Sequence, residues 1–167
     1  MRTISTAIAV TLLTAALVAQ QKGGPQAPVT YRSAADVAAM VAKAKAQNDG
    51  KASALISQGI LSLAPYKANL EYRASVGAAS VHETEAEVFY VIDGAGTLVT
   101  GGKLVGESRT NPTNLTGTAI EGGMSQAVAK GDFIVVPEKT AHWFSEIKST
   151  LVLMSMHVPR PVPDAAK

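Results

Sequence analysis

Cysteine is absent from the 167-residue chain, and histidine occurs only three times. Without cysteine the chain can form neither disulfide bonds nor thiolate metal sites, so any bound metal must be held by histidine, carboxylate or water. Aromatic residues are also few, at 5% of the chain, whereas Val, Ile, Leu and Ala are plentiful. A chain of this length can bury one respectable hydrophobic core, and it is too short for two domains of ordinary size.

A strong charge of either sign is also lacking. The formal net charge is +2 at pH 7, and the Lys and Arg residues form no basic cluster along the sequence. Domains that bind nucleic acid usually carry a pronounced basic patch. We therefore expect no nucleic-acid partner, and we expect the partner to be a small-molecule ligand or substrate.

One uncharged run, at the N-terminus, has the length of a targeting segment. A single arginine precedes Thr3 to Ala19, which is mostly apolar, and polar residues follow from Gln20 onward. This pattern predicts a signal peptide over residues 1–19, cleaved after Ala16 or Ala19. The alternative is a retained membrane anchor, although the run is slightly short for a span. We expect a periplasmic or secreted protein with no membrane contact after the signal is removed.

Residues 20–52 are expected to form a flexible leader followed by a packing helix. The leader is rich in Pro, Gly and Gln as far as Thr30. Ser33 followed three residues later by Asp36 is typical of a helix start, with Ser33 as the N-cap. The helix should continue to Gln47, where an Asn-Asp-Gly sequence ends it, and should lie on the outside of a sheet.

Residues 53–160 change to short apolar runs bounded by Gly or Pro. Many short strands separated by turn signals predict an all-β sandwich or barrel. The polar, Gly-rich segment 101–130 interrupts this pattern, and we interpret it as a long excursion with room for a hairpin. Residues 161–167 are expected to be a C-terminal tail. The predicted strands cover residues 54–57, 60–63, 68–74, 87–93, 96–100, 131–136, 142–146 and 151–158.

Two of the three histidines lie in segments that could form a metal site. His82 and Glu87 are five positions apart, so they cannot share one face of a straight strand, where side chains alternate. If the chain reverses between them, through Glu83 to Ala86, their side chains can converge. His142 would then complete a set of two histidines and one carboxylate, which suits a divalent transition metal with open coordination positions.

The spacing His82-x4-Glu87-x6-Gly94 resembles the first motif of the cupin family, and Gly131-x5-Pro137-x-Lys139-x2-His142 resembles the second. The resemblance covers Leu70 to Val158. It implies a cupin-type jelly-roll β-barrel with a short N-terminal α-helix, in which His82, Glu87 and His142 hold a metal inside the barrel. It also implies a homodimer, because members of the family often pair through sheet edges.

The motifs depart from the family pattern at three positions. Ser80 stands where the family usually has a further histidine, Lys139 stands where glycine is common, and Glu146 stands where asparagine is frequent. Ser80 should face the same side of its strand as His82, where it could bind weakly, hold a water or leave space for substrate. Three protein ligands leave a divalent ion of Fe, Mn, Zn, Ni or Cu open to water or substrate, whereas a structural zinc site would be closed by four.

Other residues are candidates for roles beside the metal. His157 in the last predicted strand is the candidate catalytic residue, because it could transfer a proton in the cavity. Phe89 and Phe144 should face the pocket, and together with Ser80 they are the candidate substrate-binding residues. A histidine at such a position is more often a barrel residue with its hydrogen bonds satisfied, and the two phenylalanines are expected to be pocket walls. Glu85 is a spare carboxylate that could replace Glu87 if the strand register differs.

Three functions remain open from the sequence. The first is a metal-dependent enzyme acting on a small organic substrate, by oxygenase, isomerase or lyase chemistry, because a fold does not determine a reaction. The second is a non-catalytic module that binds a small molecule or a metal. The third is a barrel with a relic, metal-free site. Arg73 could bind a substrate carboxylate if it points inward, but we expect it to face solvent.

Overall fold

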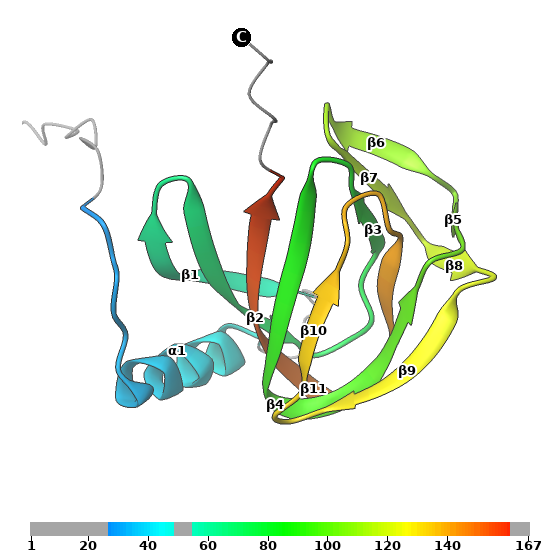
Figure 1. Cartoon of the computed structure of the whole chain (residues 1–167). Helices are drawn as coiled ribbons and strands as arrows, with labels where there is room; N and C mark the ends of the chain where they lie inside the picture. The colour runs from blue at the N-terminus through cyan, green and yellow to red at the C-terminus, as the bar shows by residue number, and fades with distance from the viewer. Residues whose placement is uncertain (1–26, 49–54, 161–167) are drawn as a thin grey trace, which may run out of the picture.

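The computed structural model describes residues 27–48 and 55–160, which form one helix followed by a β-barrel (Figure 1). This arrangement confirms the predicted fold class. The predicted signal segment, residues 1–19, and the predicted tail, residues 161–167, lie outside the described residues. Within the described part, no helix is long and apolar enough to cross a membrane.

The elements follow one another along the chain without any long interval lacking secondary structure after residue 55. The helix is α1 (Ala34–Gln47), and the strands are β1 (Ile56–Leu63), β2 (Tyr66–Arg73), β3 (Ala79–His82), β4 (Glu85–Thr100), β5 (Lys103–Val105), β6 (Ser108–Asn111), β7 (Asn114–Gly117), β8 (Ala119–Glu121), β9 (Met124–Ala129), β10 (Phe133–Val136) and β11 (His142–Pro159).

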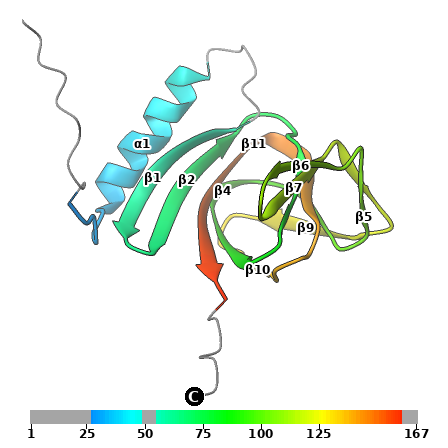
Figure 2. The same cartoon turned by 90° about the horizontal axis from the view of Figure 1, so that it is seen from above.

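Helix α1 begins as the sequence predicts. The Ser33 hydroxyl accepts a hydrogen bond from the Asp36 backbone N–H at 3.1 Å, and the Asp36 carboxylate accepts one from the Ser33 backbone N–H at 3.1 Å. This reciprocal pair satisfies two donors that a helix start would otherwise leave unpaired. The helix lies along β1 and β2, outside the barrel (Figure 2).

Two long strands, β4 and β11, form the centre of the barrel and belong to both of its walls. The second half of β11, from Leu151, pairs with β2 on one side and with the first half of β4 on the other. The first half of β11 pairs with the second half of β4, and His142 also pairs with β3. One wall therefore runs β1-β2-β11-β4-β10, and the other runs β6-β7-β3-β11-β4-β9.

Strands β4 and β11 bend where they lie opposite each other, near Gly94 and Leu151. The β11 register shifts between Lys148 and Leu151, and Gly94 of β4 lies opposite Leu151 with a φ of +86°. A Cβ atom at Gly94 would lie 2.0 Å from the Thr150 carbonyl oxygen, so no other residue fits this position without moving the backbone. The shared bend is what allows one pair of strands to serve two walls.

Side chains alternate between the two faces of each strand, and the apolar ones form two clusters, one on each side of the sheet. Leu70 and Tyr72 of β2 point toward α1 and pack with Ala44, Ile60 and Val152. The opposite face points into the barrel. The interior cluster consists of Phe89, Val91, Leu98, Val128, Val136, Phe144, Leu151 and Leu153.

Two pairs of strands that the sequence predicts as separate are single long strands in the structure. The runs 87–93 and 96–100 join into β4, and the runs 142–146 and 151–158 join into β11, because bulges carry each strand through its bend. The excursion 101–130 is more regular than expected. It contains β5 paired with β8, β6 paired with β7, and β9 on the edge of β4.

The expectation that Arg73 faces solvent is wrong. Arg73 and Glu71 occupy the interior face of β2, and the Arg73 guanidinium donates to Glu71 Oε2 from Nε at 3.0 Å and from Nη2 at 2.6 Å. Glu71 Oε1 accepts a hydrogen bond from Ser155 Oγ at 2.8 Å, and the guanidinium lies 5.0 Å from the centre of the Phe144 ring. Hydrogen bonds on both carboxylate oxygens satisfy this otherwise costly buried charge.

We predict that Glu71→Leu destabilises the protein by about 3–5 kcal/mol, because it leaves the mostly buried Arg73 without its counter-charge. Urea unfolding measures the change. Asp93→Ala breaks the exposed Asp93–Lys130 pair and should cost below about 1 kcal/mol, so it is the matched control. Equal losses in the two variants would contradict a structural role for the interior pair.

Candidate metal centre

Three strand ends bring His82, Glu87 and His142 together at one end of the barrel. His82 is the last residue of β3, Glu87 is the third residue of β4, and His142 is the first residue of β11. The reversal that joins β3 to β4 consists of Glu83 and Thr84, so it is shorter than the predicted Glu83 to Ala86 turn. The chain order is as expected, and Glu87 rather than Glu85 is the carboxylate that meets both imidazoles.

The three side chains converge on a single carboxylate oxygen. His82 Nε2 lies 3.2 Å from Glu87 Oε2, and His142 Nε2 lies 3.1 Å from the same atom. One ligand atom from each residue lies within 4.8 Å of the other two, which is a spacing that could hold a metal ion. Glu87 and His142 are only 4% and 6% exposed, so the group is largely shielded from solvent.

The other ring nitrogen of each imidazole, Nδ1, already has a hydrogen-bond partner. His82 Nδ1 lies 2.8 Å from Asn114 Oδ1, and His142 Nδ1 lies 3.3 Å from the Thr140 carbonyl oxygen. A carbonyl oxygen can only accept, so Nδ1 carries the hydrogen in both rings. In a neutral ring Nε2 then presents its lone pair, and both lone pairs point toward Glu87. Lone pairs facing a carboxylate repel it unless a proton or a cation lies between them.

The pKa values reflect this close contact. Burial by itself would raise the pKa of Glu87, but hydrogen bonds from His142 and His82, formed when their Nε2 atoms carry a proton, outweigh burial and hold that pKa far below its ordinary value. Burial opposes the charged form of His82, yet hydrogen bonds to Glu87 and Asn114 raise its pKa above the ordinary value. Glu87 is therefore an anion at neutral pH, as a metal ligand must be.

His157 lies beside this group, on the strand that pairs with β4. It is the register partner of Glu87, and its Nε2 is 3.4 Å from Glu87 Oε1. Its Nδ1 is 3.3 Å from Glu85 Oε2, and this buried atom has no hydrogen-bond partner among the residues that the structure describes. The ring meets His82 edge-on at 4.5 Å between centroids, and its side chain is one-third exposed.

The three candidate substrate-binding residues differ in their positions. Phe89 is fully buried and packs on His142 at 6.2 Å and on Phe144 at 5.5 Å between ring centroids. Both phenylalanines belong to the interior cluster, so they form the apolar floor beneath the site. Ser80 pairs with His142 across β3 and β11 and is partly exposed.

Two supporting residues were not identified from the sequence. Asn114 lies in the β6–β7 hairpin, within an Asn-Leu-Thr sequence that by itself indicates only a glycosylation acceptor. The hairpin is held against the site because the Glu83 backbone N–H donates to the Thr113 carbonyl oxygen at 2.8 Å. Arg109 also pairs with both oxygens of Glu83, at 2.7 and 3.1 Å. Such pairing between distant segments leaves no local signal in the sequence.

A comparison with protein families identifies the fold. A family model described as "Cupin" matches residues 46–161, which is more than half of the chain. The chain belongs to the cupin family. A search of curated protein sequences gave no match.

This cupin is similar to several solved structures at low sequence identity. The protein BH2720 of Bacillus halodurans shares 15% identity, with a TM-score of 0.47 over 71% of this chain and 80% of that one. KdgF from a Halomonas species shares 12% identity, with a TM-score of 0.46 over 66% of this chain and 85% of that one. FeII HppE shares 14% identity, with a TM-score of 0.47 over 62% of this chain and 50% of that one.

The residues present in this cupin fit a divalent metal. The donor set is two imidazole nitrogens with their Nδ1 atoms hydrogen-bonded and one ionised carboxylate, which suits Fe, Mn, Zn, Ni or Cu. Hydrogen bonds that fix the tautomer of a metal-ligating histidine are a regular feature of such sites.

We predict that Asn114→Leu weakens zinc binding about 10–100-fold, because His82 loses the acceptor that fixes its tautomer. Asn114→Asp keeps an acceptor oxygen and should retain most of the affinity. Competition with a chelating dye measures affinity, and ¹⁵N chemical shifts of the imidazoles report the tautomer in chelator-treated protein. A leucine variant with unchanged affinity and unchanged ¹⁵N shifts would contradict this role for Asn114.

We also predict that chelator-treated protein loses stability in acid through Glu87. The unfolded chain takes up this proton near the ordinary glutamate pKa of 4.5, whereas the folded chain, in which the pKa is lowered, holds the carboxylate ionised to much lower pH. The unfolded state therefore binds more protons below that value, and stability falls as pH decreases. Unfolding in urea from about pH 6 to about pH 3 should show a steeper fall than in Glu87→Gln. Glu121→Gln, at an exposed carboxylate, should follow the wild type.

Proposed function

We propose that the protein is an exported, single-domain cupin that binds one divalent metal ion through His82, Glu87 and His142. We further propose that it is a metal-dependent enzyme acting on a small organic substrate. Oxygenase, isomerase and lyase chemistry all remain within this proposal, because the donor set suits redox and Lewis-acid metals alike.

The observation that carries the proposal is the direction of the two imidazoles. Each uses Nδ1 for a hydrogen bond to a carbonyl oxygen, and each directs Nε2 at the same oxygen of a buried carboxylate. An arrangement made only for packing does not require two distant histidines to orient the same nitrogen toward one anion. A cation among the three atoms satisfies all of them.

The residues around the three ligands have different proposed roles in catalysis. A bound metal supplies Lewis-acid or redox chemistry and leaves positions for water or substrate. Phe89 closes the inner side and keeps water from that face of Glu87. His157 is the proposed catalytic residue, because it lies beside Glu87 and its side chain is one-third exposed. It can hold or release a proton toward a substrate there. Ser80 leaves space opposite His142 for substrate.

A non-catalytic metal-binding cupin is the second candidate. The complete burial of Phe89 and the near-complete burial of Phe144 favour it, because these rings fill the interior beside the metal ligands and limit the space for a substrate. The two candidates differ in whether a small molecule can reach the metal.

We predict that protein purified without added metal contains close to one equivalent of a divalent metal, measured by elemental analysis. His82→Ala should lose it, because one of the three ligands is removed. His157→Gln should keep it, because His157 is not among the ligands. Metal-free wild-type protein that also fails to take up zinc, manganese or iron on reconstitution would contradict the site.

Access to the metal distinguishes the enzyme from the non-catalytic binder. In Co(II)-loaded protein, added azide should change the visible spectrum if exchangeable positions face the substrate side. A spectrum unaffected by azide in protein that holds one equivalent of cobalt would favour the non-catalytic binder.

A further inference from the structure

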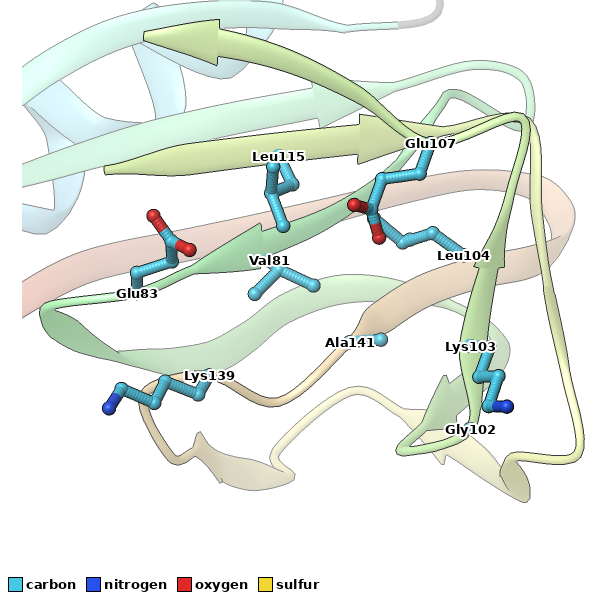
Figure 3. Close-up of a pocket in the computed structure, with 9 residues that line it drawn as sticks. All are labelled: Val81, Glu83, Gly102, Lys103, Leu104, Glu107, Leu115, Lys139 and Ala141. Carbon is cyan, nitrogen blue, oxygen red and sulfur yellow. The ribbon is translucent and has the colours of Figure 1, made fainter. Parts of the chain in front are cut away.

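A surface cavity of about 420 Å³ lies on the other face of β3 from the metal ligands. Val81 and Glu83 line it, and His82 between them points to the opposite face of the strand. The cavity is bounded by β3, β5, β7 and the segment that leads into β11 (Figure 3). Its size is within the usual range for small-molecule sites, and it is separate from the proposed metal centre.

The lining of the cavity is polarised. Val81, Leu104, Leu115 and Ala141 lie toward its centre and form an apolar floor (Figure 3). In the same view the charged residues border the floor on opposite sides. The carboxylates of Glu83 and Glu107 lie along one rim, and the chains of Lys103 and Lys139 lie at opposite ends of the other, with their ammonium groups directed away from the floor.

The four charges differ in how far they are already neutralised, because Lys139 attracts Glu83 and Glu107 attracts Arg109 at longer range. Glu83 is paired with Arg109 through both carboxylate oxygens. Within the described part of the chain, the side chains of Glu107, Lys103 and Lys139 form no hydrogen bond or ion pair. All three are exposed. The Glu107 carboxylate turns toward the floor of the cavity (Figure 3), where it can accept a hydrogen bond from a cation.

We propose that this cavity binds a small zwitterion with an ammonium group at one end, a carboxylate at the other and an apolar body between them. The ammonium pairs with Glu107, the carboxylate pairs with the flexible, exposed chain of Lys103 on the opposite rim, and the apolar body covers the floor. A ligand with only one charge leaves one rim without a partner, so the zwitterion is selected over single-charge analogues.

Occupancy of the cavity also affects the metal centre, and this part rests on the proposed metal function. Three lining residues are immediate neighbours of residues that shape the centre. Val81 precedes His82, Ala141 precedes His142, and Leu115 follows Asn114, which binds His82 Nδ1. A ligand on the floor therefore contacts side chains whose neighbours in the sequence place both imidazoles. The metal and the ligand must then change one another's affinity by the same factor.

The test uses 6-aminohexanoate as the probe, titrated into the full chain and followed by ¹⁵N–¹H NMR. Amides of β3, β5 and β7 should shift and saturate. Hexanoate and hexylamine, which carry one charge each, should bind at least about tenfold more weakly, because each loses a charge-assisted hydrogen bond. No saturable shifts with the zwitterion, or equal binding of either analogue, would overturn the proposal.

Variants locate the site. Glu107→Gln and Lys103→Gln should each weaken 6-aminohexanoate binding about tenfold, and Leu104→Trp should abolish it by filling the floor. Lys148→Gln, at an exposed lysine on β11 away from the cavity, is the matched control and should bind as the wild type does. Thermal unfolding verifies that each variant is folded. Wild-type affinity in folded Glu107→Gln and Leu104→Trp would overturn the assignment to this cavity.

Zinc affinity measured with and without saturating 6-aminohexanoate tests the coupling. It should change in the wild type and stay constant in Leu104→Trp, where the zwitterion cannot bind. An unchanged affinity in the wild type would overturn the coupling. Protein that binds the zwitterion but takes up no metal would overturn the proposed function and leave the cavity site standing.

Discussion

The buried carboxylate of Glu87 is the constraint on which the rest of the site depends. A charge that is 4% exposed is costly unless nearby groups compensate it. Here the compensation comes from His82 and His142, which are 60 residues apart in the chain and reach the same oxygen at 3.2 and 3.1 Å. Neither imidazole could do this if β3 or β11 were displaced by one residue, because a one-residue shift turns every side chain of a strand to the other face.

Strands β4 and β11, which belong to both walls of the barrel, hold the ligand residues in this register. β4 carries Glu87 and pairs with β11 along nearly its whole length, so one ladder places both His142 and His157 relative to the carboxylate strand. The bend at Gly94 lets the two ends of β11 approach the same end of the barrel. His142 opens β11 and His157 lies near its close, yet both contact Glu87. The geometry of the centre is therefore a consequence of the strand pairing in the barrel.

The fold class, the helix start and the convergence of His82, Glu87 and His142 could all be predicted, because each depends on a local pattern or on a spacing typical of a family. Other features could not be. Arg73 alternates with Tyr72 in the same way whether the arginine faces the interior or solvent, so only the partners Glu71 and Ser155 reveal its direction. Asn114 acts through a contact with a strand 32 residues away, and nothing near it in the sequence marks that contact.

The excursion 101–130 is where sequence and structure differ most, and the reason is physical. Its composition is polar and Gly-rich, which is typical of a loop, and it has little apolar material with which to form a core. It is ordered instead by the pairing of β7 with β3 and of β9 with β4. Contacts at the end of β3 add to this pairing, namely the Glu83–Thr113 backbone hydrogen bond, the Arg109–Glu83 ion pair and the contact of Asn114 with His82. These attachments connect the excursion to the strand that carries a candidate metal ligand. A change in the excursion therefore reaches His82 directly, whereas a change in α1, on the opposite wall, must act through the whole sheet.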